Sequence, residues 1–229
     1  MADAAPALTV RNLTVTAARG RWILDVPSFA LAPGTALGVR GPSGAGKSTL
    51  LFALAGLAER AEGVVDWGGT NVLALSEGAR AAFRARETGM IFQDFLLFDE
   101  LGPADNAGLQ AMFAPRPRRA GLRAAAAGLL TGLGVPTDAR TVTTFSGGER
   151  QRVAVARALA HDPGIVLADE PTASLHREAA DALIDDLVGR VRARGRTLVA
   201  VSHDDRLLDR MDRVLEIRDG CPVAAPQPA

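Results

Sequence analysis

The sequence lacks several features that would point to particular kinds of protein. It contains a single cysteine, Cys221, so neither an internal disulfide nor a cysteine metal cluster can form within the chain. No stretch approaches the roughly 18 consecutive apolar residues of a membrane-spanning helix. Residues 1–6 also lack the basic and apolar segments of a signal peptide. We therefore predict a soluble protein of the cytoplasm, whose contact with any membrane depends on a partner.

An excess of charge of one sign is also absent. Lys+Arg and Asp+Glu each number 26, which gives a formal net charge of +0 and a pI near 6.8. Dedicated nucleic-acid-binding proteins usually carry a clear basic excess. The densest basic stretch, residues 116–119, is short enough to be an ordinary solvated surface. We predict that nucleic acid is not a partner.

Hydrophobic residues are plentiful, and their order along the chain predicts an α/β protein. They make up 48% of 229 residues, enough for the core of one domain. Short β-branched runs within residues 8–31 predict antiparallel strands, and residues 102–140, rich in Ala, Leu and Gly, predict helices. Strands and helices alternate after residue 160, which is typical of a mainly parallel sheet. The Pro- and Ala-rich residues 222–229 predict a disordered tail.

Single elements can also be placed. Helices are expected over residues 47–58, over residues 77–86 after an N-cap at Ser76, and over residues 148–160. Strands are expected at residues 36–39, 90–92, 165–168, 197–201 and 214–217.

The most informative motif is a phosphate loop at residues 41–49. It fits the strand–GxxxxGK[ST]–helix pattern, in which glycines let backbone N–H groups approach phosphate oxygens and the next helix directs its positive end at the same anion. Lys47 is expected to contact the β- and γ-phosphates, and the Ser48 hydroxyl to bind Mg²⁺. The predicted nucleotide-binding residues of the loop are Gly41, Pro42, Ser43, Gly44, Ala45, Gly46, Lys47, Ser48 and Thr49.

A second motif consists of two carboxylates at the end of a buried strand. Residues 165–168 are apolar, and Asp169 and Glu170 follow them directly. Asp169 suits a contact to Mg²⁺, and Glu170 suits polarisation of an attacking water. Together with the phosphate loop, this pair predicts a nucleotide-hydrolysing P-loop protein.

A third motif identifies the family that the chain resembles. Residues 145–152, FSGGERQR, closely resemble the LSGGQ signature of ATP-binding-cassette (ABC) ATPases. Physically, a Ser-Gly-Gly start opens a helix and so presents a second anion site, formed by Ser146, Gly147 and Gly148. The resemblance runs from about residue 8 to residue 220.

The resemblance implies further site residues. Gln93 matches the Q-loop glutamine, which in the family touches Mg²⁺ and the attacking water. His203 matches the switch histidine that contacts the γ-phosphate. The catalytic set expected from the resemblance is thus Glu170, His203 and Gln93, with Ser48, Gln93 and Asp169 as the metal set.

The resemblance also implies an architecture and partners. We expect a P-loop NTPase core of mainly parallel sheet (about residues 8–90 and 160–220), with an N-terminal antiparallel β subdomain and an inserted α-helical subdomain (about residues 95–158). Two cassettes, here expected to be a homodimer, would pair head to tail around two ATP, with Ser146 acting in trans. The ATPase would drive a separate integral-membrane permease from the inner face of the cell membrane. Within the family, the likeness is greatest to the lipoprotein-release, macrolide-export and cell-division group.

Two departures from the family pattern stand out. His176 occupies the position where the D-loop usually ends in aspartate. The chain contains no tyrosine, although a tyrosine near Thr16 or Ala17 usually stacks on adenine. Trp22 is the nearest aromatic candidate, but its strand position predicts a partly buried structural residue instead.

Two other functions fit parts of the same pattern. A non-transport ABC ATPase of the cell-division type would use the same cassette to regulate a membrane partner. A nucleotide-binding regulatory module with little turnover would explain His176 and the missing tyrosine, although Glu170 and His203 argue against it.

Overall fold

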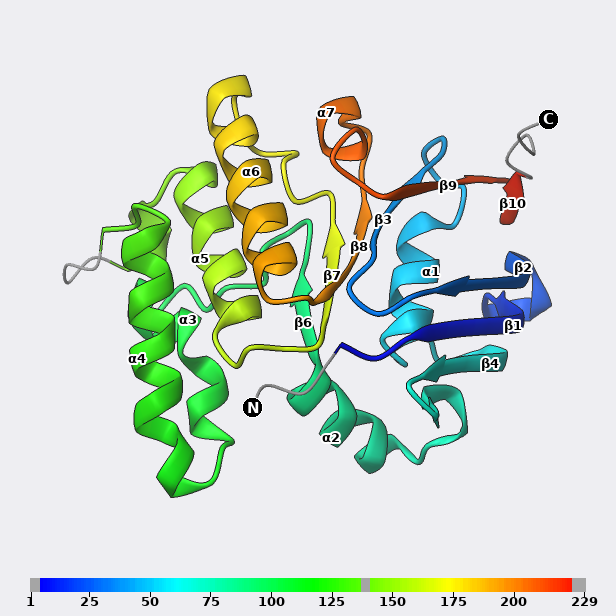
Figure 1. Ribbon diagram of the computed structural model, residues 1–229, viewed down its shortest axis with the longest axis horizontal. Coiled ribbons are helices and arrows are strands. Elements are labelled where there is room, and N and C mark those ends of the chain that lie inside the picture. Colours follow the sequence, from blue (N-terminus) through cyan, green and yellow to red (C-terminus); the bar gives the residue numbers. More distant parts are fainter. Residues whose placement is uncertain (1–4, 137–140, 224–229) are drawn as a thin grey trace.

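The computed structural model describes residues 5–136 and 141–223, which form two β-sheets and a set of flanking helices (Figure 1). The first sheet is antiparallel, has the strand order β2-β1-β4-β5 and contains β1 (Leu8–Thr16), β2 (Trp22–Leu31), β4 (Ala61–Trp67) and β5 (Thr70–Asn71). The second has the order β10-β9-β3-β8-β7-β6. It contains β3 (Ala36–Arg40), β6 (Thr88–Ile91), β7 (Ile165–Asp169), β8 (Thr197–Val201), β9 (Arg213–Arg218) and β10 (Cys221–Val223).

The second sheet is parallel except for β10, which pairs antiparallel with β9. The α-helices are α1 (Lys47–Leu54), α2 (Glu77–Glu87), α3 (Pro103–Ala107), α4 (Arg116–Gly132), α5 (Gly147–Leu159), α6 (Arg177–Ala193) and α7 (Asp205–Leu208). Short 3₁₀ helices cover Ala18–Gly20, Val72–Ala74, Leu109–Met112 and Val142–Thr144. None of the helices in the described ranges has the length and apolar character needed to cross a bilayer.

The parallel sheet separates two hydrophobic cores, because successive side chains of a strand point to opposite faces. On β7, Ile165 and Leu167 face the core shared with α1 and the antiparallel sheet, whereas Val166 and Ala168 face the core shared with α5 and α6. Strand β8 divides its side chains in the same way. Because both faces of these strands are buried, their sequences are continuous apolar runs. The sheet is therefore held rigidly from both sides, and its carboxyl edge provides a fixed platform.

Most predicted elements are confirmed, including the antiparallel strands of residues 8–31 and the helices of residues 102–136. The prediction for α1 was too long, because this helix ends at Leu54 rather than at Ala58. Gly56 adopts a left-handed φ of 65°, Gly56 N donates to Ala53 O, and Leu57 N donates to Phe52 O. This pattern is a Schellman cap, which terminates a helix in spite of the apolar periodicity that continues past it.

The predicted disordered tail was wrong at its start. Pro222 and Val223 belong to β10, where they pair with Ile217 and Glu216 of β9. An edge strand tolerates proline because one side of its backbone has no partner strand. Residues 224–229 lie outside the described residues, as do residues 137–140 at the end of the predicted helical segment.

Candidate active site

The phosphate loop connects β3 to α1 and is folded around the side chain of Lys47. The Lys47 Nζ atom donates hydrogen bonds to Gly41 O at 2.8 Å and to Pro42 O at 3.0 Å. Gly46, the N-cap of α1, has a φ of 96°, and a Cβ atom there would lie 2.9 Å from Ile23 O. Only glycine fits this position without strain. The N-terminus of α1 therefore faces the loop, as an anion site requires.

Ser48 and Asp169 meet beside this loop. The Ser48 hydroxyl donates to Asp169 Oδ1 at 3.1 Å, although the two residues are 121 positions apart in the sequence. Asp169 is buried, and burial raises the pKa of its carboxyl group, while the Ser48 hydrogen bond and the Lys47 charge oppose the increase. A hydroxyl and a carboxylate are hard oxygen ligands of the kind that Mg²⁺ prefers. Among the described residues, no group of three or more His, Cys, Asp or Glu side chains could hold a metal ion.

Glu170 and His203 form a second contact at the same sheet edge, because β7 and β8 are parallel neighbours that end together. The Glu170 Oε1 atom lies 3.4 Å from His203 Nε2, and His203 N donates to Glu170 Oε2 at 3.3 Å. The Glu170 backbone N–H donates a hydrogen bond to Val201 O at 2.9 Å. We call these two residues the Glu170–His203 pair.

The backbone of Glu170 is in an unusual conformation. Its φ of 45° is left-handed, a region that non-glycine residues occupy at a cost and that is concentrated at functional sites. Partial burial raises the pKa of the Glu170 carboxyl group, while the neighbouring His203 lowers it. A carboxylate with a raised pKa beside an imidazole is suited to accept or orient a proton.

Gln93 lies two residues after the end of β6, the strand beside β7, and is exposed to solvent. The following residues, Phe95 and Leu96, have left-handed φ values of 60° and 50°. Arg157 of α5 donates to the carbonyl oxygens of both. The loop after Gln93 is thus anchored to the helix that begins at the predicted signature.

The predicted signature residues lie apart from the phosphate loop of their own chain. Ser146 is the exposed N-cap of α5, and Gly147 and Gly148 begin the helix against Ser174 and Leu175. In Figure 1, α1 and α5 lie on opposite sides of β6 and β7. The structure thus brings the phosphate loop, Asp169, Glu170 and His203 to one sheet edge, and Gln93 follows the neighbouring strand β6. Ser146, Gly147 and Gly148 lie apart from them on α5.

The Ser-Gly-Gly sequence suggested a free anion site at the N-terminus of α5. In the structure, this helix end is already partly hydrogen-bonded. Ser146 N and Oγ donate to Glu149 Oε2, and Glu149 N donates to Ser146 Oγ at 3.3 Å. This capping box satisfies two of the N–H groups at the helix start. A ligand of the signature would therefore have to displace or share the Glu149 carboxylate.

A cavity of about 300 Å³ lies between the first hairpin and α1. Its lining includes Thr16, Ala17, Thr49, Phe52 and Arg60. The prediction that Trp22 is partly buried was wrong, because this residue is 64% exposed. Trp22 begins β2, where it pairs with Thr16 at a register shift of the β1–β2 ladder.

Some residues near the site were not found from the sequence. The charge of Asp94, next to Gln93, contributes to the raised pKa of Asp169. Arg177 and Asp204 form an ion pair beside the Glu170–His203 pair. The only sequence feature that could have indicated Asp204 is that it follows His203 directly. Nothing in the sequence pairs Arg177 with it, because their proximity depends on how α6 returns along the sheet.

Comparisons with known proteins identify a family and relatives that this chain resembles. Residues 24–173 match a family described as "ABC transporter". The lipoprotein-releasing system ATP-binding protein LolD of Oleidesulfovibrio alaskensis is 40% identical over 191 residues, which cover 83% of this chain and 82% of the relative. The dimeric structure of MJ0796, a bacterial ABC transporter cassette, has a TM-score of 0.85 at 28% identity and covers 95% of this chain and 97% of that one. A post-hydrolysis dimer of the same cassette, bound to ADP and Pi, has a TM-score of 0.83 at the same identity and coverage.

Proposed function

Because the chain belongs to the ABC transporter family and is an ATP-binding, ATP-hydrolysing cassette, we propose that it powers a separate membrane permease by closing and opening a dimer around ATP. One observation carries the catalytic part of this proposal. Lys47, the Ser48–Asp169 contact and the Glu170–His203 pair all lie at the carboxyl edge of β3, β7 and β8. Ligands of open α/β sheets bind at this edge.

Each side chain has a role that follows from its position. The ammonium group of Lys47 exchanges its two carbonyl partners for the β- and γ-phosphates of ATP. Glu170 orients the attacking water, and its raised pKa suits a group that accepts a hydrogen bond from that water. The imidazole of His203, 3.4 Å from Glu170, contacts the γ-phosphate and keeps the carboxylate in place.

The residues present fit a magnesium ion. Ser48, Asp169 and Gln93 would hold it, and when bound it neutralises charge on the phosphate oxygens. Mg²⁺ usually takes only one or two protein carboxylates and completes its coordination with phosphates and water. The single buried carboxylate of Asp169 agrees with this coordination preference.

The signature completes the site in a second copy of the chain. Ser146, Gly147 and Gly148 lie away from the phosphate loop of their own chain, so they are available to a neighbouring molecule. Two structures of the related cassette MJ0796 are dimeric, one of them a post-hydrolysis state bound to ADP and Pi, which supports this arrangement. We propose a head-to-tail homodimer in which Ser146 of one copy faces Lys47 of the other across the γ-phosphate.

A groove beside the Gln93 loop is suited to the permease. Its volume is about 400 Å³, and it is open to solvent. Its apolar lining includes Leu57, Met90, Phe92, Leu96, Phe98 and Leu109, and two arginines, Arg84 and Arg157, contribute positive charge. We propose that a short, partly acidic cytoplasmic segment of the permease binds here, which would place the cassette on the inner face of the membrane.

The groove shares residues with the site, which would couple the two. Arg157 lines the groove and also holds the carbonyl groups of Phe95 and Leu96, two and three residues beyond Gln93. A movement of the bound permease segment would therefore reach the sheet edge through this loop. The LolD relative supports a lipoprotein-release type of system over a non-transport regulator.

The proposal can be tested with Glu170→Gln. This variant should bind ATP with unchanged affinity, hydrolyse it at least roughly 100-fold more slowly, and accumulate as a nucleotide-bound dimer in size-exclusion chromatography. The amide preserves the size of the side chain but no longer carries the charge that polarises water. Hydrolysis at the wild-type rate would show that Glu170 is not the catalytic carboxylate.

Ser146→Arg provides the matched test of the second half-site. Its bulk and charge should prevent dimer formation, also in the Glu170→Gln background, while ATP binding by the monomer is retained. Loss of ATP binding by the monomer would instead mean that the signature contacts the nucleotide of its own chain.

A further inference from the structure

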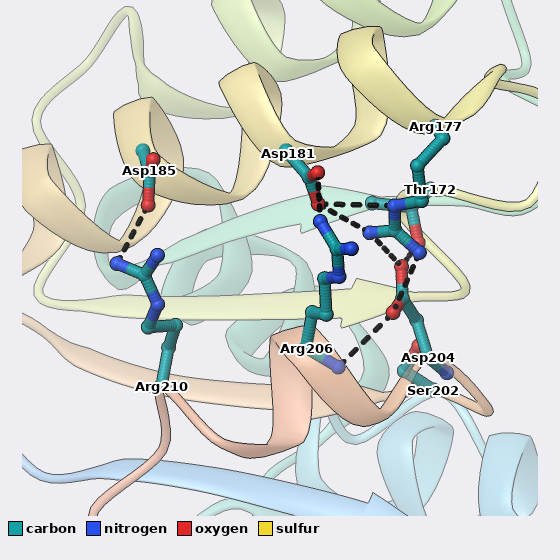
Figure 2. A network of polar contacts seen from close by, with 8 residues as sticks. All are labelled: Thr172, Arg177, Asp181, Asp185, Ser202, Asp204, Arg206 and Arg210. Atoms are coloured by element: carbon teal, nitrogen blue, oxygen red, sulfur yellow. Dashed lines mark hydrogen bonds and ion pairs between the residues drawn. The ribbon is translucent and has the colours of Figure 1, made fainter.

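Arg177 occupies a position that is unfavourable for a positive charge. It is the first residue of α6, and the N-terminal end of a helix already carries partial positive charge. Within the described chain, the preceding N-cap residue His176 makes no side-chain capping hydrogen bond that would stabilise this end. The cost is offset by two carboxylates, Asp204 and Asp181, toward which the guanidinium points (Figure 2).

The contact to Asp204 is made at two points. Arg177 Nη1 donates to Asp204 Oδ1 at 3.2 Å, and Nη2 donates to Oδ2 at 3.1 Å. Asp204 Oδ2 also accepts from Thr172 Oγ1 at 3.5 Å. A planar guanidinium that binds both oxygens of a carboxylate fixes its orientation as well as its distance.

Asp204 connects the two segments that carry the Glu170–His203 pair. It follows His203 directly, and its partner Thr172 lies two residues after Glu170. Its backbone N–H donates to Ser202 Oγ at 3.0 Å, which closes the turn on the other side of His203. The imidazole of His203 is 56% exposed, so few contacts of its own hold it. Its position therefore depends on the backbone at Asp204.

Asp181, one turn further along α6, anchors Arg177 from behind. Arg177 Nε donates to Asp181 Oδ1 at 3.1 Å, and Nη2 contacts the same oxygen. Arg206 of α7 contacts the other oxygen of Asp181 (Figure 2). The guanidinium of Arg177 is thus fixed to α6 on one side and to the His203 turn on the other. Such a bridge transmits the position of the helix to the turn.

We propose that Arg177 is a positioning residue for ATP hydrolysis, which holds His203 beside Glu170 by binding Asp204 at two points. The inference depends on the proposed roles of Glu170 and His203. It adds that the start of α6 sets the geometry of the switch histidine. Arg177 itself touches neither nucleotide nor metal in this scheme.

The chain contains a matched control for this interaction. Arg210 Nη1 lies 2.7 Å from Asp185 Oδ1, an ion pair that also joins α6 to the segment around α7 (Figure 2). Its two side chains are 56% and 57% exposed, and it involves neither Asp204 nor the Glu170–His203 pair. Removing it deletes an Arg–Asp ion pair between the same two segments, at a place that does not position His203.

The test compares Arg177→Ala, Arg177→Lys and Arg210→Ala in the full chain. Arg177→Ala should lower kcat roughly tenfold while the Kd for ATP changes less than about twofold, because misplacing a catalytic group affects turnover more than binding. Arg177→Lys keeps the charge but cannot form the two-point contact. Its kcat should therefore lie between that of Arg177→Ala and that of the wild type. Arg210→Ala should retain the wild-type kcat and Kd.

A double variant shows whether Arg177 acts through Asp204. Asp204→Asn keeps an oxygen that can accept from Arg206 N, as Asp204 Oδ1 does at 3.1 Å, but it loses the charge that Arg177 binds. Combined with Arg177→Ala, it should be no slower than the slower single variant. If the two reductions in kcat multiply instead, Arg177 does not act through Asp204 and the proposal is overturned.

The remaining outcomes also discriminate. A wild-type kcat for Arg177→Ala overturns the positioning role, while a slow Glu170→Gln in the same assay leaves the proposed catalytic function intact. A wild-type kcat for Glu170→Gln would overturn that function itself. Thermal melting monitors the fold of each variant. Should Arg177→Ala fail to fold, Arg177→Lys keeps the test decisive, since a wild-type kcat there would exclude the two-point contact.

Discussion

The phosphate loop lies within nine consecutive residues, 41–49, whereas the Glu170–His203 pair joins residues 33 positions apart. In the loop, Lys47 bonds to carbonyl groups only five and six residues before it. At the pair, Glu170 and Arg177, which follow β7 and begin α6, make contacts to the end of β8 and the turn after it. A short segment can thus specify the phosphate loop, whereas the Glu170–His203 pair depends on how two strands and a helix are arranged.

This contrast implies a division of labour. Substitutions in the phosphate loop should change nucleotide affinity, because the loop is proposed to bind the phosphates of ATP in its ground state. Substitutions at the Glu170–His203 pair should change turnover, because the pair is proposed to act on the attacking water and the terminal phosphate. Comparing Kd with kcat for variants of both regions tests that division.

The largest effect is expected for Lys47→Ala. Loss of the buried ammonium should raise the Kd for ATP on the order of 100-fold, which corresponds to about 2.7 kcal/mol. Isothermal titration with ATP measures it. Lys47 is also the only lysine in the chain, so an amine-reactive label with mass-spectrometric detection reports on this side chain directly. ATP should protect it from the label, and labelling that ATP leaves unchanged would contradict the assigned role.

A comparable effect on turnover, with little on binding, is expected for His203→Ala. Loss of the imidazole should lower kcat roughly 100-fold, the scale of a positioned proton-transfer or charge-stabilising group. The Kd for ATP should stay within about twofold of wild type. Steady-state phosphate release and titration calorimetry measure the two quantities. A large increase in Kd for this variant would break the division between the two regions.

A smaller effect, on stability, is expected for Asp169→Asn without nucleotide. Burial raises the pKa of Asp169 in the folded state, so its ionised form opposes folding. The wild type therefore loses stability as pH rises from the usual carboxyl range through the raised pKa. At pH 7 the neutral asparagine should raise Tm by roughly 2 °C.

The pH dependence provides the control for that measurement. The difference in Tm between Asp169→Asn and wild type should shrink as pH falls toward the ordinary range of carboxyl groups, because both side chains are then neutral. A variant that melts below wild type at pH 7 would show that the Ser48 hydrogen bond to the carboxylate outweighs the cost of burying its charge.

Sequence reasoning was most successful where chemistry is local. The glycine pattern around Lys47, the apolar run before Asp169 and the Ser-Gly-Gly helix start each specified their own conformation, and the structure places all three as expected. It was less successful where a long-range or capping interaction decides. The Schellman cap at Gly56 ended α1 early, pairing with β9 ordered Pro222 and Val223, and the hairpin left Trp22 exposed.

The sequence by itself determined the family, the phosphate loop and the two acidic residues, because each depends on residue types at fixed short spacing. Only the tertiary structure decided that Asp204 pairs with Arg177 and that the hydroxyl of the signature serine, Ser146, donates a hydrogen bond to Glu149. It also placed the signature away from the phosphate loop of its own chain. Parallel strands and long helices bring distant residues together through packing of the whole sheet, which no short stretch of sequence encodes.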